Sequence, residues 1–459
     1  MSARQSPMSR EHAANFARDG IAPSTGVARL RLRGRLNLFQ TAMLRWRELH
    51  PYNAVHVVRV MRPLERARLE AAIAERLGTA GLTGLVIDRS RRRYEYRGGP
   101  AVVDLEIIIG GDDGSAVVRV EIERQLNRPF PADGPLVPFR FFACDENASF
   151  RLGLAYDHFV AGGDSIAILL NDIVHSYMGA PMERTQPDLY PATFAPVFVR
   201  NAGTLLRGLG ALSNIVATCR RSVRPRYRDH QDGYNGFDYV TLAAPAAVAL
   251  RAKAKSLGVT FNDVLVAIIL KAVARDLPET RRGGRRGEIG LTSIVNLRNE
   301  CGLRERDAFG QFLSSMPISH RVPDGISLEA LAQDVHRETA RFKEKKLYLQ
   351  MLLAMRINGI VWWFLNHQRR QRVYAKAFPM MAGLTTLNID ALWRSAAGNG
   401  DPRDYLRAVP TGPVAPLVVA ATSSCGGLAI GLSYRRSAFD PPHIAKIAAF
   451  IADSISAFQ

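Results

Sequence analysis

The sequence predicts an α/β or α+β fold made of two lobes of similar size. A chain of 459 residues is long enough for two lobes that each bury a core of their own. Segments with strand periodicity alternate with segments of helical periodicity in both halves. Between the halves, the stretch 179–235 contains five prolines, which favours a crossover between lobes.

The elements of the first half follow from the spacing of apolar residues. Helices are expected where apolar residues recur every three or four positions, and strands where β-branched and aromatic residues run together. Residues 1–36 lack this periodicity and mix Arg, Ser, Pro and Gly, which predicts a basic flexible arm before a lobe spanning 37–180. The expected helices cover 38–49, 65–77 and 165–177, and the expected strands 55–60, 102–109, 117–122, 139–143 and 150–156.

The second half is interpreted in the same way. A crossover over 181–236, with one helix inside it, is expected to lead into a second lobe over 237–459. That lobe begins with a strand near Tyr239 and continues with helices over 245–257 and 262–277 and a strand over 289–296.

The charge balance indicates acidic partners. The chain has 61 Lys and Arg residues against 42 Asp and Glu residues, a net charge of +19, but only eight of the 61 are Lys. That bias is typical of a GC-rich genome, and no pattern of stacking aromatic residues accompanies the charge, so we expect no nucleic-acid binding. The basic stretches 220–228 and 281–287 are either sites for coenzyme A phosphates or an acidic carrier protein, or solvated surface.

Four cysteines are spaced too widely to form a metal or redox motif. None belongs to a CxxC pair, so neither a zinc site nor a redox motif is expected. Cys425 is expected to be a small buried side chain. The first twenty residues lack an apolar segment, and no stretch has the length and composition of a membrane span, which favours reduced thiols and a cytoplasmic location.

The most informative segment is LAYDHFVAGGDSIAILL at 154–170. His158 stands where the expected strand ends, Gly162 and Gly163 follow in the loop, and Asp164 lies in the first turn of the next helix. A histidine beside glycines that let a ligand approach is well placed for a general base. From this segment alone, a structural histidine followed by a simple turn is an equally good interpretation.

This segment resembles the HHxxxDGxS motif of the condensation-like acyltransferase superfamily. That superfamily includes the condensation domains of nonribosomal peptide synthetases, wax ester synthases and chloramphenicol acetyltransferase. In register, Asp157 takes the position of the first His and His158 that of the second, which is the catalytic one. Gly162 takes the position of the Asp, Gly163 that of the Gly and Ser165 that of the Ser.

Further segments occur in the order known from the same superfamily. Together they extend the resemblance over residues 38–459 and are specific for the superfamily but not for a substrate. They are RQLNRPFPADGPL at 124–136, TFNDVLVA at 260–267, IVNLR at 294–298, AFGQFLSS at 308–315, where Gln311 replaces Asn, and GLAIGLSYRRSAFD at 427–440.

The resemblance implies two lobes like those of chloramphenicol acetyltransferase, which form a pseudo-dimer with a tunnel between them. His158 would act as general base, and an acyl group would pass from coenzyme A or an acyl carrier protein to an alcohol or amine, with no cofactor. Asn262 is a candidate for the donor that stabilises the oxyanion, although Thr260 or Asn262 equally well caps its helix. Ser423 and Asn388 are weaker candidates.

The sequence departs from the motif at two positions, and one of them affects the architecture. The motif Asp pairs with an Arg in the superfamily, but this chain has Gly162 there. Asp164, two residues later, is within reach of Arg298 in the IVNLR segment, which also contains Asn296, so we expect a displaced buried ion pair. The alternative is a catalytically degenerate protein that binds or assembles, in which His158 is dispensable.

An apolar stretch at 347–366 is a further feature that bears on the substrate or on a surface contact. It fits either an interfacial helix that contacts a membrane or a long acyl chain, or a core helix between the lobes. The first interpretation favours a lipid-type acyltransferase with a peripheral contact at the inner membrane face, while a carrier-protein enzyme of natural-product biosynthesis is close behind. A monomer is sufficient in either case. Basic residues flank the stretch: Lys343, Lys345, Lys346, Arg369, Arg370 and Arg372.

Overall fold

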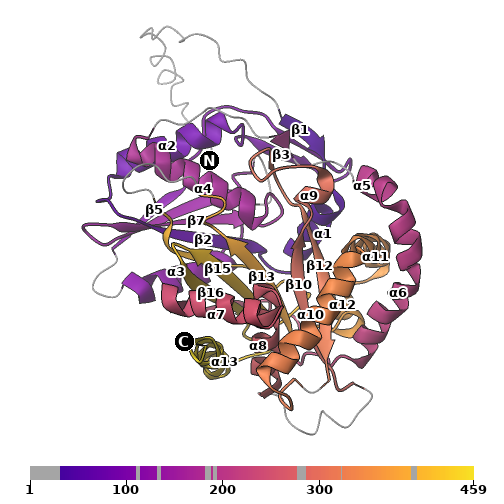
Figure 1. The fold of residues 1–459 in the computed structure, drawn as a ribbon. Helices are drawn as coiled ribbons and strands as arrows, with labels where there is room; N and C mark the ends of the chain where they lie inside the picture. Colours follow the sequence, from indigo (N-terminus) through magenta and orange to yellow (C-terminus); the bar gives the residue numbers. More distant parts are fainter. Residues whose placement is uncertain are drawn as a thin grey trace, which may run out of the picture.

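The first half of the chain folds into a lobe whose elements follow the predicted order (Figure 1). The computed structural model describes residues 32–109, 114–131, 136–180, 188–189, 194–275, 286–321, 323–393 and 401–458. The elements of this lobe are β1 (Leu32–Arg35), α1 (Leu38–Arg47), β2 (Asn53–Val60), α2 (Arg66–Thr79), β3 (Leu85–Asp88), β4 (Arg93–Tyr96), β5 (Leu105–Ile109), α3 (Gly114–Asn127), β6 (Phe139–Asp145), β7 (Phe150–Asp157) and α4 (Gly163–Met178).

A connecting region and a second lobe follow. The connection contains β8 (Asp188–Leu189), α5 (Ala195–Arg200) and α6 (Ala202–Arg221). The second lobe contains β9 (Asn235–Leu242), α7 (Ala244–Ser256), α8 (Phe261–Arg275), β10 (Ile289–Asn296), α9 (Arg298–Cys301), β11 (Ala308–Phe309), β12 (Leu313–His320), α10 (Leu328–Glu344), α11 (Tyr348–Val361), the 3-10 turn η2 (Trp362–Phe364), α12 (His367–Ala377), β13 (Ala382–Asn388), β14 (Arg403–Ala408), β15 (Leu417–Ser424), β16 (Gly427–Arg435) and α13 (Pro441–Ser456).

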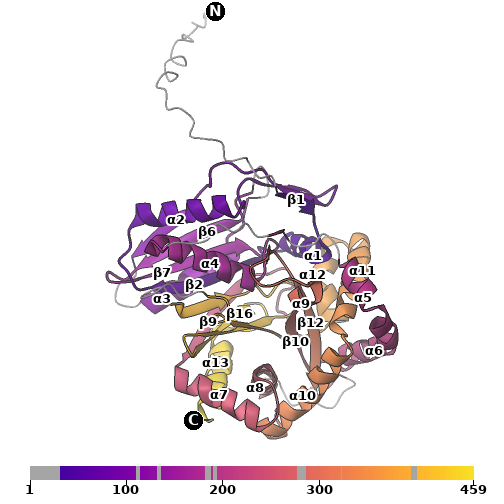
Figure 2. The ribbon, with the colours of Figure 1, turned by 45° about the horizontal axis from the view of Figure 1, so that its top comes forward.

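Each lobe is built on one mixed sheet. The first sheet has the order β14-β2-β7-β6-β5 and the second the order β12-β10-β13-β15-β16-β9. Figure 2 shows α2 above the first sheet and α7, α8 and α13 below the second, while α3 lies between the sheets and contacts β2 and β9. The α/β fold with two lobes is therefore confirmed.

Alternation along β2 explains how the first sheet is buried on both faces. Successive side chains of a strand point to opposite faces, so residues of one parity face one core and those of the other parity face another. Val55 and Val57 join the core that includes Val118 of α3 and Phe237 of β9. Ala54, Val58 and Val60 join the core under α2 and α4.

Strand β14 belongs to the second half of the chain but pairs with the first sheet. It runs antiparallel to β2, with Arg407 opposite His56 and Ala408 opposite Val55. The same strand packs against β15 and β16 of the second sheet. One strand thus connects the two sheets directly, which the division of the sequence into two successive lobes did not anticipate.

Two predicted elements of the first half are wrong. Residues 117–122, predicted as a strand, lie inside α3, because Val118, Ile122 and Leu126 repeat every four residues and are buried on one helix face. The predicted flexible arm ends early, because residues 32–35 form β1, which pairs with β4. The part of the arm before residue 32 lies outside the described residues.

The connection between the lobes contains more structure than predicted. Two consecutive helices, α5 and α6, meet at Asn201, where one helix was expected. The basic loop 281–287 lies largely outside the described residues, but its Arg286 donates hydrogen bonds to the backbone oxygens of Cys219 and Ser222 at 3.0 and 3.1 Å. That residue is therefore part of the packing of α6 against the second lobe.

Two further observations bear on the sequence-based expectations. Cys425 is exposed in the turn between β15 and β16, so its predicted burial is wrong; a positive φ of 47° places it at the tip of that turn. In the described part of the chain, no single helix has the length and hydropathy needed to cross a bilayer, whereas two sharply bent helix pairs meet that test together, α7 with α8 and α10 with α11.

Candidate functional site

The site forms where β7 ends and α4 begins. β7 stops at Asp157, a short loop carries His158, and α4 starts at Gly163 with Gly162 as its N-cap. Two backbone hydrogen bonds fix the loop: the His158 N–H donates to the Tyr52 oxygen at 3.0 Å, and the Gly162 N–H donates to the Gly310 oxygen at 2.9 Å. The first lobe thus positions the histidine, and the second lobe holds the loop behind it.

His158 is almost fully buried among aromatic rings. Its side chain packs against Tyr52 and Tyr156, with ring centroids 5.5 and 5.6 Å away. Tyr156 in turn stacks edge-on against His56, at 5.7 Å. The Tyr156 hydroxyl and the His56 Nε2 are both buried without a hydrogen-bond partner among the described residues.

Burial sets the protonation state of His158. Removal from water lowers the pKa of its imidazole to about 4, and the positive charge of Arg407 acts in the same direction, while a hydrogen bond to the Ala161 backbone opposes both. The ring is therefore neutral at physiological pH, and a neutral imidazole accepts a proton.

Gln311 holds the His158 loop from the second lobe. Its side-chain amide nitrogen donates to the backbone oxygens of His158 and Ala161 and lies 3.4 Å from His158 Nδ1. Gln311 thus lies beside the Nδ1 side of the ring as well as holding the backbone of the loop. Gln311 replaces the Asn of the superfamily in the segment AFGQFLSS, and sequence analysis assigned it no role beyond that replacement.

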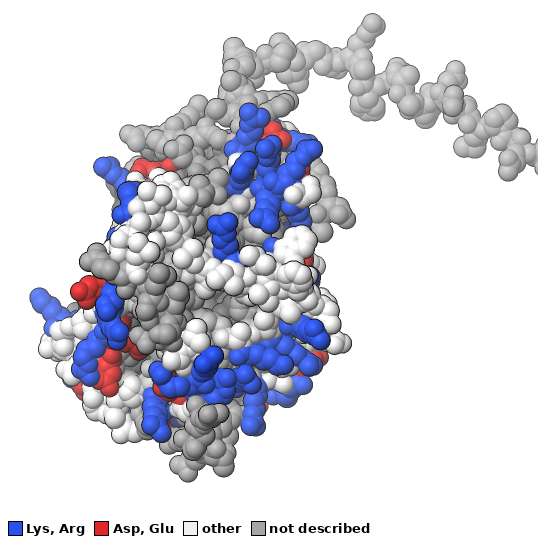
Figure 3. Space-filling model, turned by 90° about the vertical axis from the view of Figure 1, so that its right-hand side faces the viewer, with Lys and Arg blue, Asp and Glu red and all other residues white. Residues whose placement is uncertain are grey.

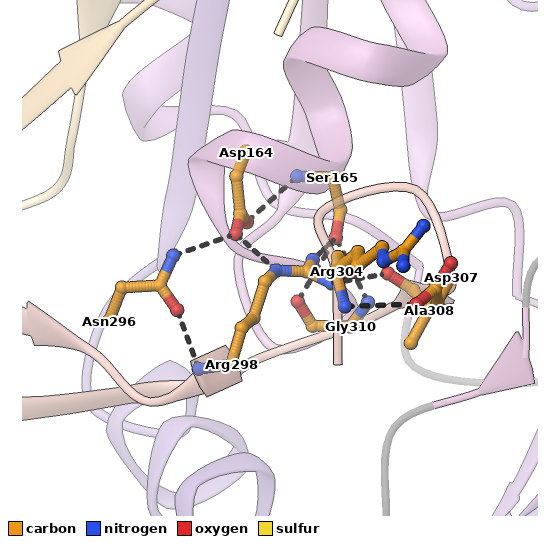
Figure 4. Close-up of polar contacts among 8 residues, drawn as sticks. All are labelled: Asp164, Ser165, Asn296, Arg298, Arg304, Asp307, Ala308 and Gly310. Carbon is orange, nitrogen blue, oxygen red and sulfur yellow. Dashed lines mark hydrogen bonds and ion pairs between the residues drawn. The ribbon is translucent and has the colours of Figure 1, made fainter. Parts of the chain in front are cut away.

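The predicted ion pair between Asp164 and Arg298 is present (Figure 4). Arg298 Nε donates to Asp164 Oδ2 at 2.5 Å, and both side chains are more than nine-tenths buried. Asn296 Nδ2 donates to the same carboxylate oxygen at 3.1 Å, while its Oδ1 accepts the Arg298 N–H at 2.9 Å. Removing one member of such a pair leaves a buried charge without its partner, so the pair is a strong architectural constraint.

Ser165 adds further contacts between α4 and the second lobe. Its hydroxyl accepts from Arg298 Nη2 at 2.6 Å and from the Gly310 N–H at 3.1 Å. Arg298 Nη1 donates to the Ala308 oxygen at 2.7 Å. The side chains of Asp164, Ser165, Asn296 and Arg298 therefore form one network across the lobe boundary, as Figure 4 shows.

The space around Gly162 explains why the acid stands two residues later. A Cβ built at Gly162 would lie 3.0 Å from Asp164 Oδ1 and 3.5 Å from both the Gln311 Oε1 and the Gly310 oxygen. A carboxylate there would face other hydrogen-bond acceptors. A Cβ at Gly163 would lie 3.1 Å from Arg407 Nη1, so glycine permits close approach of that guanidinium.

Asp157, which takes the position of the first motif His, is used for an ion pair. It contacts Arg47 of α1 at 2.7 Å and is nearly inaccessible to solvent. Burial raises the pKa of its carboxyl to about 6, although Arg47 opposes that shift. Its role in the structure is to hold α1 against the end of β7.

Among the described residues, neither Asn262 nor Ser423 forms a hydrogen bond or an ion pair with this network. The Asn262 amide donates to Ser293 on β10 at 3.3 Å. Thr260 and Asp263, rather than Asn262, cap α8 by reciprocal hydrogen bonds of 2.7–3.2 Å. Ser423 is buried in β15, where its backbone oxygen accepts from Ile389 at 2.9 Å. Their catalytic and substrate-binding roles remain predictions.

The sequence missed a buried cation beside the motif. Arg407 of β14 is 2% exposed and donates from Nε to Thr422 and from Nη2 to the Ala421 oxygen, at 2.8 and 2.9 Å. Burial lowers the pKa of its guanidinium to about 10. It lies opposite His56, whose Nδ1 is 2.8 Å from the Tyr405 hydroxyl. No sequence signal links these strands, because they are about 350 residues apart.

Two cavities stand out in the described part of the chain, and His158 lines neither. A cavity of about 330 Å³ lies beside the small β1-β4-β3 sheet and is lined by residues including Leu82, Ala101 and Phe139. A much smaller one lies near Trp46, Tyr52 and Arg435. Within the described residues there is also no group of three or more His, Cys, Asp or Glu side chains able to hold a metal ion.

Of the comparisons with known proteins, only the comparison of structures finds similar proteins. No protein-family model matches the sequence, and no curated protein does. The cyclization-docking bidomain of EpoB from Sorangium cellulosum superposes with a TM-score of 0.68 at 14% identity, covering 93% of this chain and 84% of that one.

Two further solved structures cover nearly the whole of both chains. The condensation domain of the monacolin K polyketide synthase MokA gives a TM-score of 0.63 at 13% identity, over 93% of this chain and 97% of that one. The epimerization domain from the third module of tyrocidine synthetase B gives 0.61 at 15% identity, over 94% and 96%. Identities this low establish the fold alone, and the chain has the two-lobed fold of the condensation and epimerization domains of natural-product synthetases.

Proposed function

We propose that the protein is an acyltransferase in lipid or natural-product biosynthesis. It moves an acyl group from a thioester of coenzyme A or of an acyl carrier protein to a hydroxyl or amine, with His158 as general base. The observation that carries the proposal is His158 itself: a neutral, buried imidazole at a strand end, behind which both lobes hold the loop. A general base of this kind needs the unprotonated ring and a fixed orientation.

The reaction is direct transfer. The acceptor oxygen or nitrogen attacks the thioester carbonyl while its proton passes to the His158 imidazole, giving a tetrahedral oxyanion. Collapse of this intermediate breaks the carbon–sulfur bond, and the leaving thiolate takes the proton from the imidazolium. No acyl-enzyme is formed, and holding both reactants in line supplies much of the rate.

Two groups are candidates for stabilising the oxyanion. Asn262 offers an amide at the start of α8, next to Ser293 of β10. Arg407 offers a buried guanidinium whose Nη1 points toward Gly163 at the start of α4, the helix that follows His158. A positive group in a buried site stabilises developing negative charge strongly, which favours Arg407.

A second candidate function is that of a catalytically degenerate binding or assembly protein. The observations in its favour are the replacement of two motif positions, by Asp157 and Gly162, and the absence of His158 from the lining of either cavity described above. The retained network around Asp164 and Arg298 is compatible with both functions, because it stabilises the loop whether or not chemistry takes place.

The first experiment measures thiol release. Purified protein is incubated with acyl-coenzyme A donors, then with acyl carrier proteins, each with lipid-alcohol and amine acceptors. Acceptor-dependent release of free thiol is expected for the parent protein, and loss of about 10²–10⁴-fold for His158→Ala, the range that a general base contributes. His50→Ala, at a partly buried histidine bonded to Asn127, is the matched control and should retain activity.

The outcomes separate the two functions. Release by the parent that His158→Ala retains would contradict the assignment of the base. No release with either donor type, from a protein whose circular dichroism shows it folded, would favour the binding protein. Asn262→Ala and Arg407→Lys in the same assay rank the two oxyanion donors, because the true donor loses turnover without loss of thioester binding.

A further inference from the structure

A cluster of large apolar side chains is exposed at the end of α11 and in η2. We call it the α11 tip. Its exposures are far above those of core residues: Ile357 63%, Ile360 60%, Val361 42%, Trp363 70% and Phe364 82%. These five are among thirteen large apolar side chains exposed in the described part of the chain. Single exposed apolar residues are ordinary, but five within eight positions indicate a surface that binds something.

Most of the tip follows one side of α11 and continues into η2. Ile357, Ile360, Val361 and Phe364 follow the i, i+3, i+4, i+7 spacing of one helical stripe. The opposite end of α11, from Tyr348 to Leu352, is buried. The predicted core helix therefore holds for the first half of this stretch, while the second half projects outward.

The tip is anchored to the rest of the molecule on two sides. Trp362 is buried against Tyr374 of α12, and the Arg370 guanidinium lies 5.4 Å from the Trp362 ring. On the other side, Arg45 Nη1 of α1 donates to the Gly359 oxygen at 3.0 Å. The neighbouring Trp363 is thereby presented to solvent while Trp362 anchors it.

The stretch of sequence that contains the tip is basic and contains no acid. From residue 345 to residue 389 the sequence has seven Lys and Arg residues and no Asp or Glu. Arg356, Arg369, Arg372 and Lys376 among them are exposed. Figure 3, which faces the side of the molecule where Figure 1 places α5, α6 and α11, shows clusters of Lys and Arg around a broad area of other residues, with few acids.

A second segment of the same character lies beside the first. α6 packs next to α11, and the stretch 189–228 that contains it also has seven basic residues and no acidic ones. Val199, Leu206 and Val216 of α5 and α6 are exposed as well, at 75%, 68% and 48%. Two stretches distant in sequence therefore give one face the same combination of apolar and positive groups.

We propose that the α11 tip and the basic residues around it bind the surface of an anionic phospholipid bilayer. The tip enters the headgroup region with its aromatic and branched side chains, and the arginines remain at the level of the lipid phosphates. An amphipathic helix with arginines beside Trp and Phe has the composition of segments that lie in this interface.

The observations favour a bilayer over an acidic protein. A protein partner would be met by a complementary groove or a flat patch, whereas here Trp363 and Phe364 project at 70% and 82% exposure from a helix end. A projecting aromatic tip surrounded by guanidinium groups fits a fluid surface that adapts to it. This inference is independent of the proposed acyl transfer, since it uses none of the residues of the His158 site.

The test is vesicle flotation of the full chain. Vesicles of phosphatidylcholine alone are compared with vesicles of equal parts phosphatidylcholine and phosphatidylglycerol, at low and high salt. Binding to the anionic vesicles is expected to exceed binding to the neutral ones by about tenfold or more, and to weaken as salt screens the arginines.

Variants locate the contact. Trp363→Ser with Phe364→Ser should lower binding by about tenfold or more, as the loss of two buried aromatic side chains implies. Arg369→Gln with Arg372→Gln should remove the preference for anionic vesicles. The control is Val102→Ser with Ile109→Ser, at 63% and 87% exposure in the first lobe, which should leave binding unchanged.

Tryptophan emission gives a second readout from the unmodified chain. The protein has four tryptophans, and Trp46, Trp362 and Trp393 are buried, so a change on vesicle addition reports on Trp363. A blue shift is expected with anionic vesicles and should vanish in Trp363→Phe, which keeps binding. The proposal is overturned if the chain fails to float with anionic vesicles, if neutral vesicles bind equally, or if the tip variant binds as the parent does.

Discussion

At the scale of single residues, burial reverses the usual order of the pKa values of two neighbouring side chains, Asp157 and His158. Asp157 has its carboxyl pKa raised to about 6, and His158 has its imidazole pKa lowered to about 4, in both cases mainly by burial. The stability linked to His158 is lost as pH falls from the ordinary value of about 6.5 toward 4, and that linked to Asp157 is lost as pH rises through about 6. The two slopes oppose each other between pH 4 and 6.

The acid limb of the activity profile tests the lowered pKa of His158. A general base works only when unprotonated, so activity is lost as pH falls through its pKa. We expect kcat/KM for thiol release to stay level from pH 8 down to about 5.5, because the base titrates near 4. The measurement is kcat/KM against pH, with circular dichroism at each pH to exclude unfolding. A limb centred near 6.5 would show that the His158 ring is solvated in the free enzyme.

At the scale of elements, β14 determines how the two sheets meet. It pairs with β2 through Leu406, Arg407 and Ala408, and it packs on β16 of the other sheet. Gly431 of β16 makes this approach possible, since a Cβ there would lie 2.1 Å from the Arg407 oxygen. The neighbour is backbone, which a rotamer change does not move.

We therefore expect Gly431→Ala to destabilise the protein. The added methyl group must push β16 and β14 apart, and overpacking of this kind costs about 1–3 kcal/mol, or more where backbone must shift. Urea unfolding followed by tryptophan fluorescence gives the change in the free energy of unfolding. Gly78→Ala in α2 is the control, because a Cβ there meets nothing within 4 Å and alanine stabilises a helix by about 0.5–1 kcal/mol. Equal stability of the two variants would contradict this account of β14.

Sequence periodicity predicted the elements well where one local pattern dominated. β10 has the predicted bounds, Ile289–Asn296, and α4 differs from its prediction by a turn or less. It failed over 117–122, where β-branched residues concealed a four-residue repeat, and at β1, whose strand depends on pairing with β4. Non-local pairing leaves no trace in a short window of sequence, so β14 could not be placed either.

The candidate site, too, could be predicted from the sequence only in part. The motif segment and IVNLR, taken together, led to the pairing of Asp164 with Arg298, and the pair is present. His56 reaches the site from β2, Tyr52 from the residue just before that strand, and Arg407 from β14, so all three are positioned by the pairing of β2 and β14 or by the residue next to it. A buried arginine or histidine on a strand resembles any other polar residue in the sequence, so only the fold identifies it.

At the scale of the whole molecule, the loop that carries His158 is also the junction of the lobes. Asp164 and Ser165 belong to α4 of the first lobe, whereas Arg298, Ala308 and Gly310 belong to the second. The orientation of the histidine therefore depends on the docking of the lobes. A substitution at the junction should affect folding and activity together, even where it leaves the imidazole itself in place.

The ion pair between Asp164 and Arg298 provides the decisive test of whether the docking of the lobes supports both folding and activity. Asp164→Asn leaves the guanidinium of Arg298 buried without its counter-charge, and breaking a buried pair in this way costs about 3–5 kcal/mol, a large share of the 5–15 kcal/mol that holds an ordinary protein folded. Removing both charges is different, because similarly sized apolar residues avoid the cost of burying either one, so Asp164→Leu with Arg298→Met should recover most of the lost stability. Urea unfolding of the parent and the two variants measures both effects.

Glu70→Gln at the exposed pair with Arg66 serves as the control, since surface pairs contribute about 0–1 kcal/mol. A single variant as stable as the parent would mean that water reaches the pair and that the lobes are held together elsewhere. If instead the double variant is stable but lacks thiol release, the charges are needed to orient the His158 loop rather than to fold the chain.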